Sequence, residues 1–121
     1  METKSNAIKD KSYQFALRII KLYQYLTKEK KEFVLSKQIL RSGTAVGALV
    51  QEAAQGESKA DFVHKLSMAN KEASETSYWI SLLRDSGLID EKAAQSILKD
   101  NNEIKKILAS IILTTKTRLN K

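Results

Sequence analysis

The sequence has no cysteine, no proline and a single histidine among its 121 residues. Without cysteine, the chain can form no disulfide and no thiolate metal site, which favours the cytoplasm as its location. Because His64 is the only histidine, a polyhistidine metal site is excluded, and the serines and threonines have no plausible partner base. The absence of proline removes the commonest helix breaker, and β-rich runs between turn residues are also missing. These absences predict an all-α protein.

Long apolar runs are absent as well. No window approaches the roughly 18 apolar residues that a membrane span needs. The N-terminal stretch METKSNAIKDKSYQ also lacks the apolar core of a secretory signal peptide. We therefore expect a soluble, cytoplasmic protein with no membrane partner.

Positive charge is in excess, because 21 lysine and arginine residues stand against 14 acidic residues and give a formal net charge of +7. The excess lies towards the two ends of the chain. Residues 1–50 contain ten basic and four acidic residues, residues 51–89 contain four and six, and residues 90–121 contain seven and four. A basic balance of this kind favours an anionic partner such as nucleic acid.

Apolar residues recur at alternating spacings of three and four through four segments, which is the period of amphipathic helices in a bundle. Ser58 and Asp61 stand at capping-box spacing before the third segment, and Gly87 suits the end of that helix. With 42% hydrophobic residues, the chain can bury one core. The sequence predicts a single-domain, up-down-up-down antiparallel four-helix bundle, with helices at about 10–28, 36–55, 58–86 and 90–119.

Three glycines, Gly43, Gly47 and Gly56, lie in the stretch RSGTAVGALVQEAAQGES. A phosphate-binding loop is not expected there, because no strand precedes the glycines and no Gly-Lys-Ser/Thr follows them. A glycine inside a helix costs roughly 1 kcal/mol relative to alanine, so close approach by another helix is the expected compensation. The sequence leaves open whether that helix belongs to the same chain or to another copy.

A second apolar stripe runs opposite the core stripe on the first and third predicted helices. A bundle helix needs only one apolar face, so a second face indicates a second contact. The alternative is a broad core with half-buried aromatic residues. We expect a homo-oligomer whose interface contains Tyr13, Leu17, Ile20, Gly43, Gly47, Met68, Tyr78, Trp79 and Leu82.

Patterns for metal binding and catalysis are weak. A di-iron bundle site needs two Glu-x-x-His motifs, and the nearest matches here are Asp61-x-x-His64 and Glu72-x-x-Glu75. Since Glu72 and Glu75 flank the second apolar stripe, we expect them to pair with lysine or arginine across an interface. The sequence predicts no catalytic residue, no metal site and no cofactor, and therefore a protein that is not an enzyme.

Lys92, Lys99 and Lys106 recur every seven residues behind the apolar stripe of the last predicted helix. Together with Arg18 and Lys21, they are the candidates for phosphate contacts of low sequence specificity with RNA or DNA. No recognition helix, aromatic stacking platform or zinc finger is evident. The competing interpretations are a merely solvated lysine face and a structural module that docks a protein partner.

A family resemblance is carried by residues 35–83, LSKQILRSGTAVGALVQEAAQGESKADFVHKLSMANKEASETSYWISLL, and most specifically by QILRSGTAVGA, SKADFVHKL, KEASET and YWISLL. With the flanking FALRIIKLY, nearly the whole chain resembles the bacterial 23S rRNA-intervening sequence proteins, also labelled S23 ribosomal protein. This family includes relatives of the accessory variability protein of diversity-generating retroelements. The resemblance implies four-helix protomers in a ring, commonly a pentamer, with a basic surface suited to nucleic acid. By analogy it implies a protein partner such as a reverse transcriptase, and it implies no catalytic residue or cofactor.

One position departs from the family pattern. Relatives commonly carry asparagine after the residues that correspond to Gly47 and Ala48, whereas this sequence has Leu49. The polar contact that such an asparagine makes is therefore not expected in this protein.

Overall fold

The computed structural model describes residues 3–119, and in that range it contains four helices and no strand. The helices are α1 (Lys4–Lys28), α2 (Leu35–Ala54), α3 (Lys59–Asp85) and α4 (Glu91–Leu119). The all-α prediction is confirmed. None of these helices combines the length and the apolar character needed to cross a membrane.

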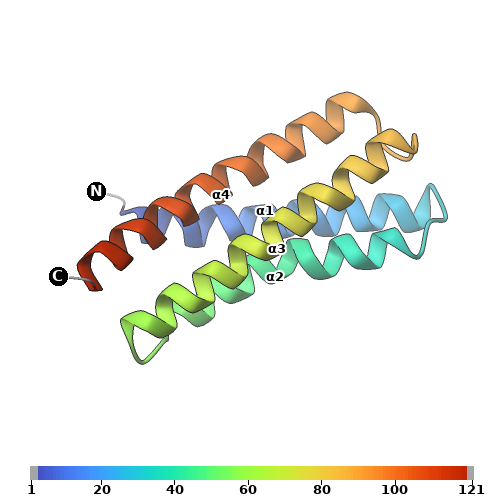
Figure 1. The fold of residues 1–121 in the computed structure, drawn as a ribbon. Helices are drawn as coiled ribbons and strands as arrows, with labels where there is room; N and C mark the ends of the chain where they lie inside the picture. The colour runs from blue at the N-terminus through green and yellow to red at the C-terminus, as the bar shows by residue number, and fades with distance from the viewer. Residues whose placement is uncertain (1–2, 120–121) are drawn as a thin grey trace.

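The helices run alternately up and down, and each packs against the next one along the chain (Figure 1). The α1–α2 and α3–α4 loops lie at one end of the bundle, while the α2–α3 loop lies at the other end with the start of α1 and the end of α4. α2 packs extensively against both α1 and α3, whereas α1 and α4 share the smallest contact of the four neighbouring pairs. The predicted up-down-up-down topology is therefore confirmed. We call the contact between two neighbouring helices a seam, and the loosest seam lies between α1 and α4.

The boundaries of α2, α3 and α4 lie within one residue of the expected ones, but α1 begins at Lys4 and not near residue 10. The Thr3 hydroxyl accepts a hydrogen bond from the Asn6 N–H at 3.2 Å and so caps the first turn. The Ser58 hydroxyl caps α3 in the same way, through the Asp61 N–H at 3.0 Å. The early turn of α1 is mostly polar, so its residues show no apolar period that predicts a helix.

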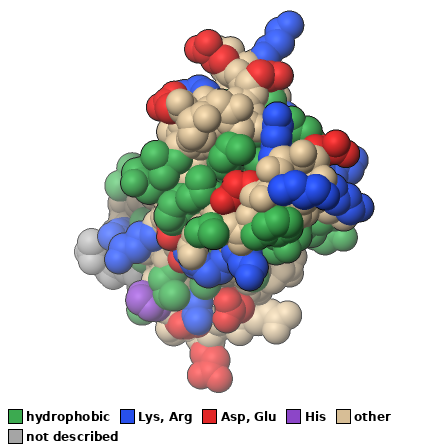
Figure 2. All heavy atoms as spheres, turned by 90° about the vertical axis from the view of Figure 1, so that its right-hand side faces the viewer, with side chains coloured by type: hydrophobic (Ala, Val, Ile, Leu, Met, Phe, Trp, Pro, Cys, Tyr) green, Lys and Arg blue, Asp and Glu red, His purple; other side chains and the backbone are tan. Residues whose placement is uncertain are grey.

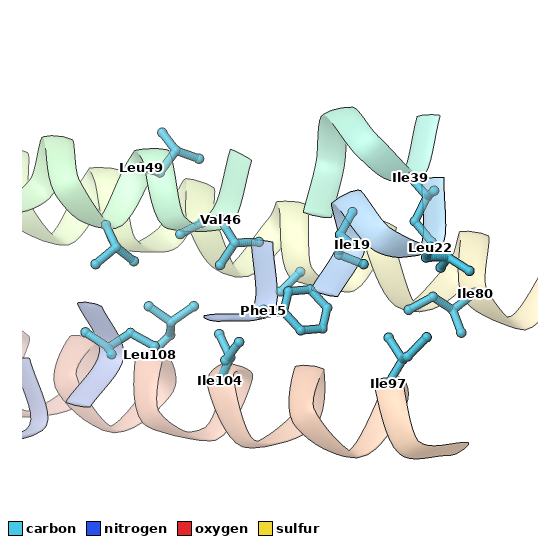
Figure 3. Packing of buried hydrophobic residues seen from close by; sticks show 14 of the residues in the cluster. Phe15, Ile19, Leu22, Ile39, Val46, Leu49, Ile80, Ile97, Ile104 and Leu108 are labelled. Atoms are coloured by element: carbon cyan, nitrogen blue, oxygen red, sulfur yellow. The ribbon is translucent and has the colours of Figure 1, made fainter. Parts of the chain in front are cut away.

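The predicted apolar stripes form the core of the bundle. Phe15 of α1, Ile80 of α3 and Ile104 of α4 point into one interior (Figure 3), and none of them is more than 2% exposed. Burying a side chain of this size contributes roughly 1.5–3 kcal/mol. Phe62 and Thr115, at the ends of their stripes, are only half-buried.

Leu49, which follows Gly47 and Ala48 on α2, has a buried side chain that belongs to the core cluster (Figure 3). An apolar side chain at this position needs no hydrogen-bond partner in the core.

The glycines of α2 allow α1 of the same chain to approach closely. A Cβ atom on Gly43 would lie only 2.7 Å from the Ile19 Cγ1 atom, and one on Gly47 would lie 3.2 Å from the Ser12 carbonyl oxygen. The approaching helix is therefore an intramolecular neighbour. The assignment of Gly43 to an oligomer interface is wrong, because this residue is buried against Ile19.

Buried polar groups tie α3 to the helices on either side of it. The Thr76 hydroxyl donates to the Ser42 hydroxyl at 2.9 Å, and the Asn101 side-chain N–H groups donate to the Ala73 carbonyl and the Ser77 hydroxyl, each at 2.7 Å. A shift of one residue between these helices would leave buried polar groups without partners, which costs roughly 1–3 kcal/mol for each group. The bonds therefore help to fix the register of α2 and α4 against α3.

Candidate functional site

The outer face of α4 carries a row of basic and amide side chains. Lys92, Lys99 and Lys106 are exposed, and Gln95 and Asn102 lie between them on the same face. We call these five residues the α4 stripe. Successive lysines are about 10 Å apart along the helix axis, since each residue rises about 1.5 Å. Within residues 3–118, none of the three lysines forms an ion pair.

Arg84 of α3 extends the positive charge beside the stripe. It borders an open groove of about 500 Å³ that Lys99 and Lys106 also line. Two carboxylates, Glu91 and Glu103, lie in the same groove, and Arg84 itself pairs with Asp85 at 2.8 Å. The lysines of the stripe, and not Arg84, are therefore the cations that are available to an anionic partner.

Arg18, the predicted phosphate contact on α1, is already engaged. Its guanidinium donates to the Asp100 carboxylate at 2.6 Å, to the Ser96 hydroxyl at 2.7 Å and to the Ser96 carbonyl at 3.3 Å. These bonds bridge α1 and α4 and offset the charge of the guanidinium. Lys21, its predicted companion, is exposed and lies on the rim of a groove between the same helices.

The second apolar stripe exists as two exposed strips on the surface. On α1, Tyr13 is 59% exposed and Leu17 is 42% exposed, and Ile20 continues the strip. On α3, Met68 and Tyr78 are exposed, whereas Trp79 and Leu82 are half-buried and Trp79 packs against the core. The rings of Tyr78 and Trp79 meet edge to face, with centroids 5.2 Å apart. Apolar surface is therefore available for a further contact on α1 and, to a smaller extent, on α3.

Glu72 and Glu75 bind Arg41 of the same chain. The Arg41 guanidinium donates to the Glu72 carboxylate at 3.0 Å and also bonds the Glu75 carboxylate. The hydrogen bond from Arg41 lowers the pKa of Glu75, and the two carboxylates raise the pKa of Arg41. The expected pairing of these carboxylates with a basic residue is confirmed, but the cation comes from α2 of the same chain and not from another copy.

The candidate metal motif does not gather ligands. His64 is exposed on α3, and in the described part of the chain no three histidine or carboxylate side chains come together. The other prominent features of the described surface are the α4 stripe and the two apolar strips.

Sequence reasoning missed two exposed aromatic residues near the end that carries the α1–α2 and α3–α4 loops. Tyr25 of α1 is 42% exposed and Phe33 of the α1–α2 loop is 54% exposed. Figure 2 looks onto this end and shows hydrophobic side chains gathered across its middle, with lysine and arginine side chains at several points around them. The sequence did not single out these two residues, since one aromatic residue at a helix end or in a loop belongs to no apolar repeat.

The comparisons with known proteins agree with this architecture. The family model described as 23S rRNA-intervening sequence protein matches residues 4–110. A crystal structure of a protein of unknown function from the S23 ribosomal protein family of Bacteroides thetaiotaomicron is 54% identical to this chain and has a TM-score of 0.90. That similarity covers 91% of this chain and 98% of the solved one, while no curated protein matches. Because the family model spans most of its length, the chain belongs to the family of 23S rRNA-intervening sequence proteins.

Proposed function

We propose that this protein is a non-enzymatic, self-associating four-helix bundle that binds RNA or DNA with low sequence specificity. The observation that carries the proposal is the α4 stripe, whose three lysines are exposed and, within residues 3–118, form no ion pair. Lysine contacts with phosphate oxygens supply affinity without reading the bases, because every sequence has the same phosphates.

Self-association is supported by the exposed apolar strips on α1 and α3. In an assembly each copy adds its own α4 stripe, and several weak patches on one particle bind one nucleic acid far more tightly than a single patch does. The family resemblance favours a pentameric ring. Light scattering on the purified chain tests this part: a mass several times 13.6 kDa supports it, and a monomer at working concentration contradicts it.

The stripe is tested by reversing its charge in the triple variant Lys92→Glu, Lys99→Glu and Lys106→Glu. Fluorescence anisotropy with a structured RNA and with a duplex DNA, each at several salt concentrations, measures the affinity. We expect the wild-type affinity to fall steeply with salt, because each phosphate contact adds about 0.7–0.9 to the slope of log affinity against log salt. The triple variant should bind at least tenfold more weakly and with a shallower slope.

A matched control separates the stripe from net charge. Lys37, Lys59 and Lys71 are also exposed but lie on α2 and α3. Their triple replacement by glutamate changes the net charge equally. Circular dichroism and light scattering must show unchanged helicity and mass in both variants. Equal weakening by the two triples would mean that only overall charge matters, and it would remove the stripe from the proposal.

Docking of a protein partner, such as a reverse transcriptase, is the second candidate function. The α1 strip of Tyr13, Leu17 and Ile20 favours it, since tyrosine is among the residue types that most often carry the binding energy of an interface. A complex of the two purified proteins that survives nuclease treatment would support docking. A complex that nuclease dissolves would mean that nucleic acid bridges the two proteins.

A further inference from the structure

The loose seam between α1 and α4 contains an open groove near the α3–α4 loop. It encloses about 460 Å³, and its apolar lining comes from Leu22 of α1, Ile89 of the loop, and Ala93 and Ile97 of α4. Tyr25 of α1 stands beside these residues and forms an aromatic wall. We call this feature the Tyr25 groove.

Tyr25 is positioned to offer a ring to a planar partner. The residue is 42% exposed and lies in the last turn of α1. The Lys30 ammonium lies 6.0 Å from the centre of its ring. An aromatic ring beside an apolar surface suits stacking with a nucleobase, because every base has an apolar π-face whatever its sequence. This ammonium makes a cation–π contact with the ring, so a base would stack on the part of the ring that Lys30 leaves exposed.

The charges at the rim favour an anionic occupant. Lys21 is exposed on the rim, and Lys92 of the α4 stripe is the immediate neighbour of Ala93 in the lining. The Asp90 carboxylate also lines the groove and, as the cap of α4, accepts the Ala93 N–H at 2.6 Å, so its negative charge lies against the helix N-terminus. Arg18, another lining residue, pairs with Asp100. Lys21 is therefore the basic lining residue that forms no ion pair within residues 3–118.

We propose that the Tyr25 groove binds an unpaired nucleobase, which stacks on the Tyr25 ring while its phosphate meets Lys21. This inference rests on the proposed nucleic-acid binding and gives it a substrate class, namely single-stranded or looped RNA or DNA. Bases in a continuous duplex are already stacked and paired, so they do not enter the groove. Lys92 of the α4 stripe precedes Ala93 of the lining in the sequence but points about 100° away around the helix, so a strand held by the stripe must pass around α4 to enter the groove.

The test compares Tyr25→Ala with wild type on a single-stranded RNA and on a fully paired RNA duplex of the same sequence. We expect Tyr25→Ala to weaken binding of the single strand by about tenfold and to leave duplex binding unchanged, because loss of one base–aromatic stack acts only on an unpaired base. Tyr25→Phe should bind both RNAs like wild type. Phe33→Ala is the matched control, since Phe33 is also an exposed aromatic residue at this end of the bundle but does not line the groove.

The outcomes separate this inference from the proposed function. Unchanged binding of the single strand by Tyr25→Ala overturns the groove and leaves the α4 stripe intact. Equal weakening on single strand and duplex also overturns it, because Tyr25 would then support the surface in general. If wild type binds neither RNA even at low salt, the proposed function itself fails and the groove fails with it. Circular dichroism on each variant confirms that the comparison is made on folded protein.

Discussion

α1 closes against α2 through glycine, whereas it is bridged to α4 by polar and charged side chains. At the α1–α2 seam, Gly43 lies so close to Ile19 that a methyl group would clash. At the α1–α4 seam, Arg18 bonds Asp100 and Ser96, Lys11 lies 3.6 Å from Glu103, and open grooves remain between the bridges. The α1–α2 seam also carries a groove of about 250 Å³ beside Gly47, so the contrast lies at Gly43 and not along the whole seam. The close contact at Gly43 stabilises the fold, while the grooves between the α1–α4 bridges leave space for a ligand.

The largest effect on this comparison should come from filling the tight seam. In Gly43→Leu, the new side chain has no room beside the buried Ile19, so we expect the free energy of unfolding to fall by about 3 kcal/mol. Urea denaturation followed by circular dichroism measures it. Adding Ile19→Ala should recover part of the loss, because it opens the space that the leucine needs. Simple addition of the two losses would contradict this account of the seam.

Gly47→Ala is the comparison for Gly43→Leu, because both glycines of α2 face α1. A Cβ atom here would lie 3.2 Å from the Ser12 carbonyl oxygen, which requires only a small adjustment. The gain in helix propensity of about 1 kcal/mol offsets much of that cost. We therefore expect almost no change in the free energy of unfolding, far from the loss in Gly43→Leu.

An effect smaller than that of Gly43→Leu should come from Glu32, a charged group that caps α2. Its carboxylate accepts the N–H groups of Leu35 and Ser36 at 3.0 and 2.8 Å, and that of Val34 at 3.1 Å. Partial burial alone would raise the pKa of Glu32, but these hydrogen bonds outweigh it and the pKa is lowered. We expect Glu32→Ala to cost about 1 kcal/mol at pH 7, measured by urea denaturation.

The pH dependence of that loss has a definite sign. Because the pKa of Glu32 is lower in the folded chain, its contribution is complete above the unfolded value of about 4.3 and is lost as the pH falls through the folded value. Wild type and Glu32→Ala should therefore differ less in strong acid than at pH 7. Glu29→Ala, in the same loop, is the control. A difference that grows in acid would refute the cap.

An effect smaller than that of Glu32→Ala should come from breaking the Arg18–Asp100 bridge between α1 and α4. The Arg18–Asp100 pair is substantially exposed, with 36% and 47% of the two side chains accessible, and exposed ion pairs contribute less than about 1 kcal/mol. Arg18→Ala should therefore change the free energy of unfolding only slightly, and less still in high salt. A loss as large as that in Gly43→Leu would show that the two seams hold the fold equally.

The sequence anticipated much of the bundle and only part of the surface. The core stripe of α3 could be predicted because Leu66, Ala73 and Ile80 repeat with the helical period, and the structure buries all three. The ion-pair partner of Arg18 could not be predicted, since Asp100 lies on another helix, 82 residues later. Tyr25 was missed for a related reason: an isolated aromatic residue becomes a groove wall only when a second helix stands opposite it.

The sequence by itself determined four amphipathic helices, their order, their short connections and their membership in one bundle, because periodicity and capping are local properties of the chain. Only the tertiary structure decided which helix fills the space beside Gly43, and that Arg41 binds Glu72 and Glu75 within the same chain. These pairings depend on how each helix is rotated about its axis and on its register with its neighbours. Rotation and register are fixed by the packing of the whole core, so no single segment contains them.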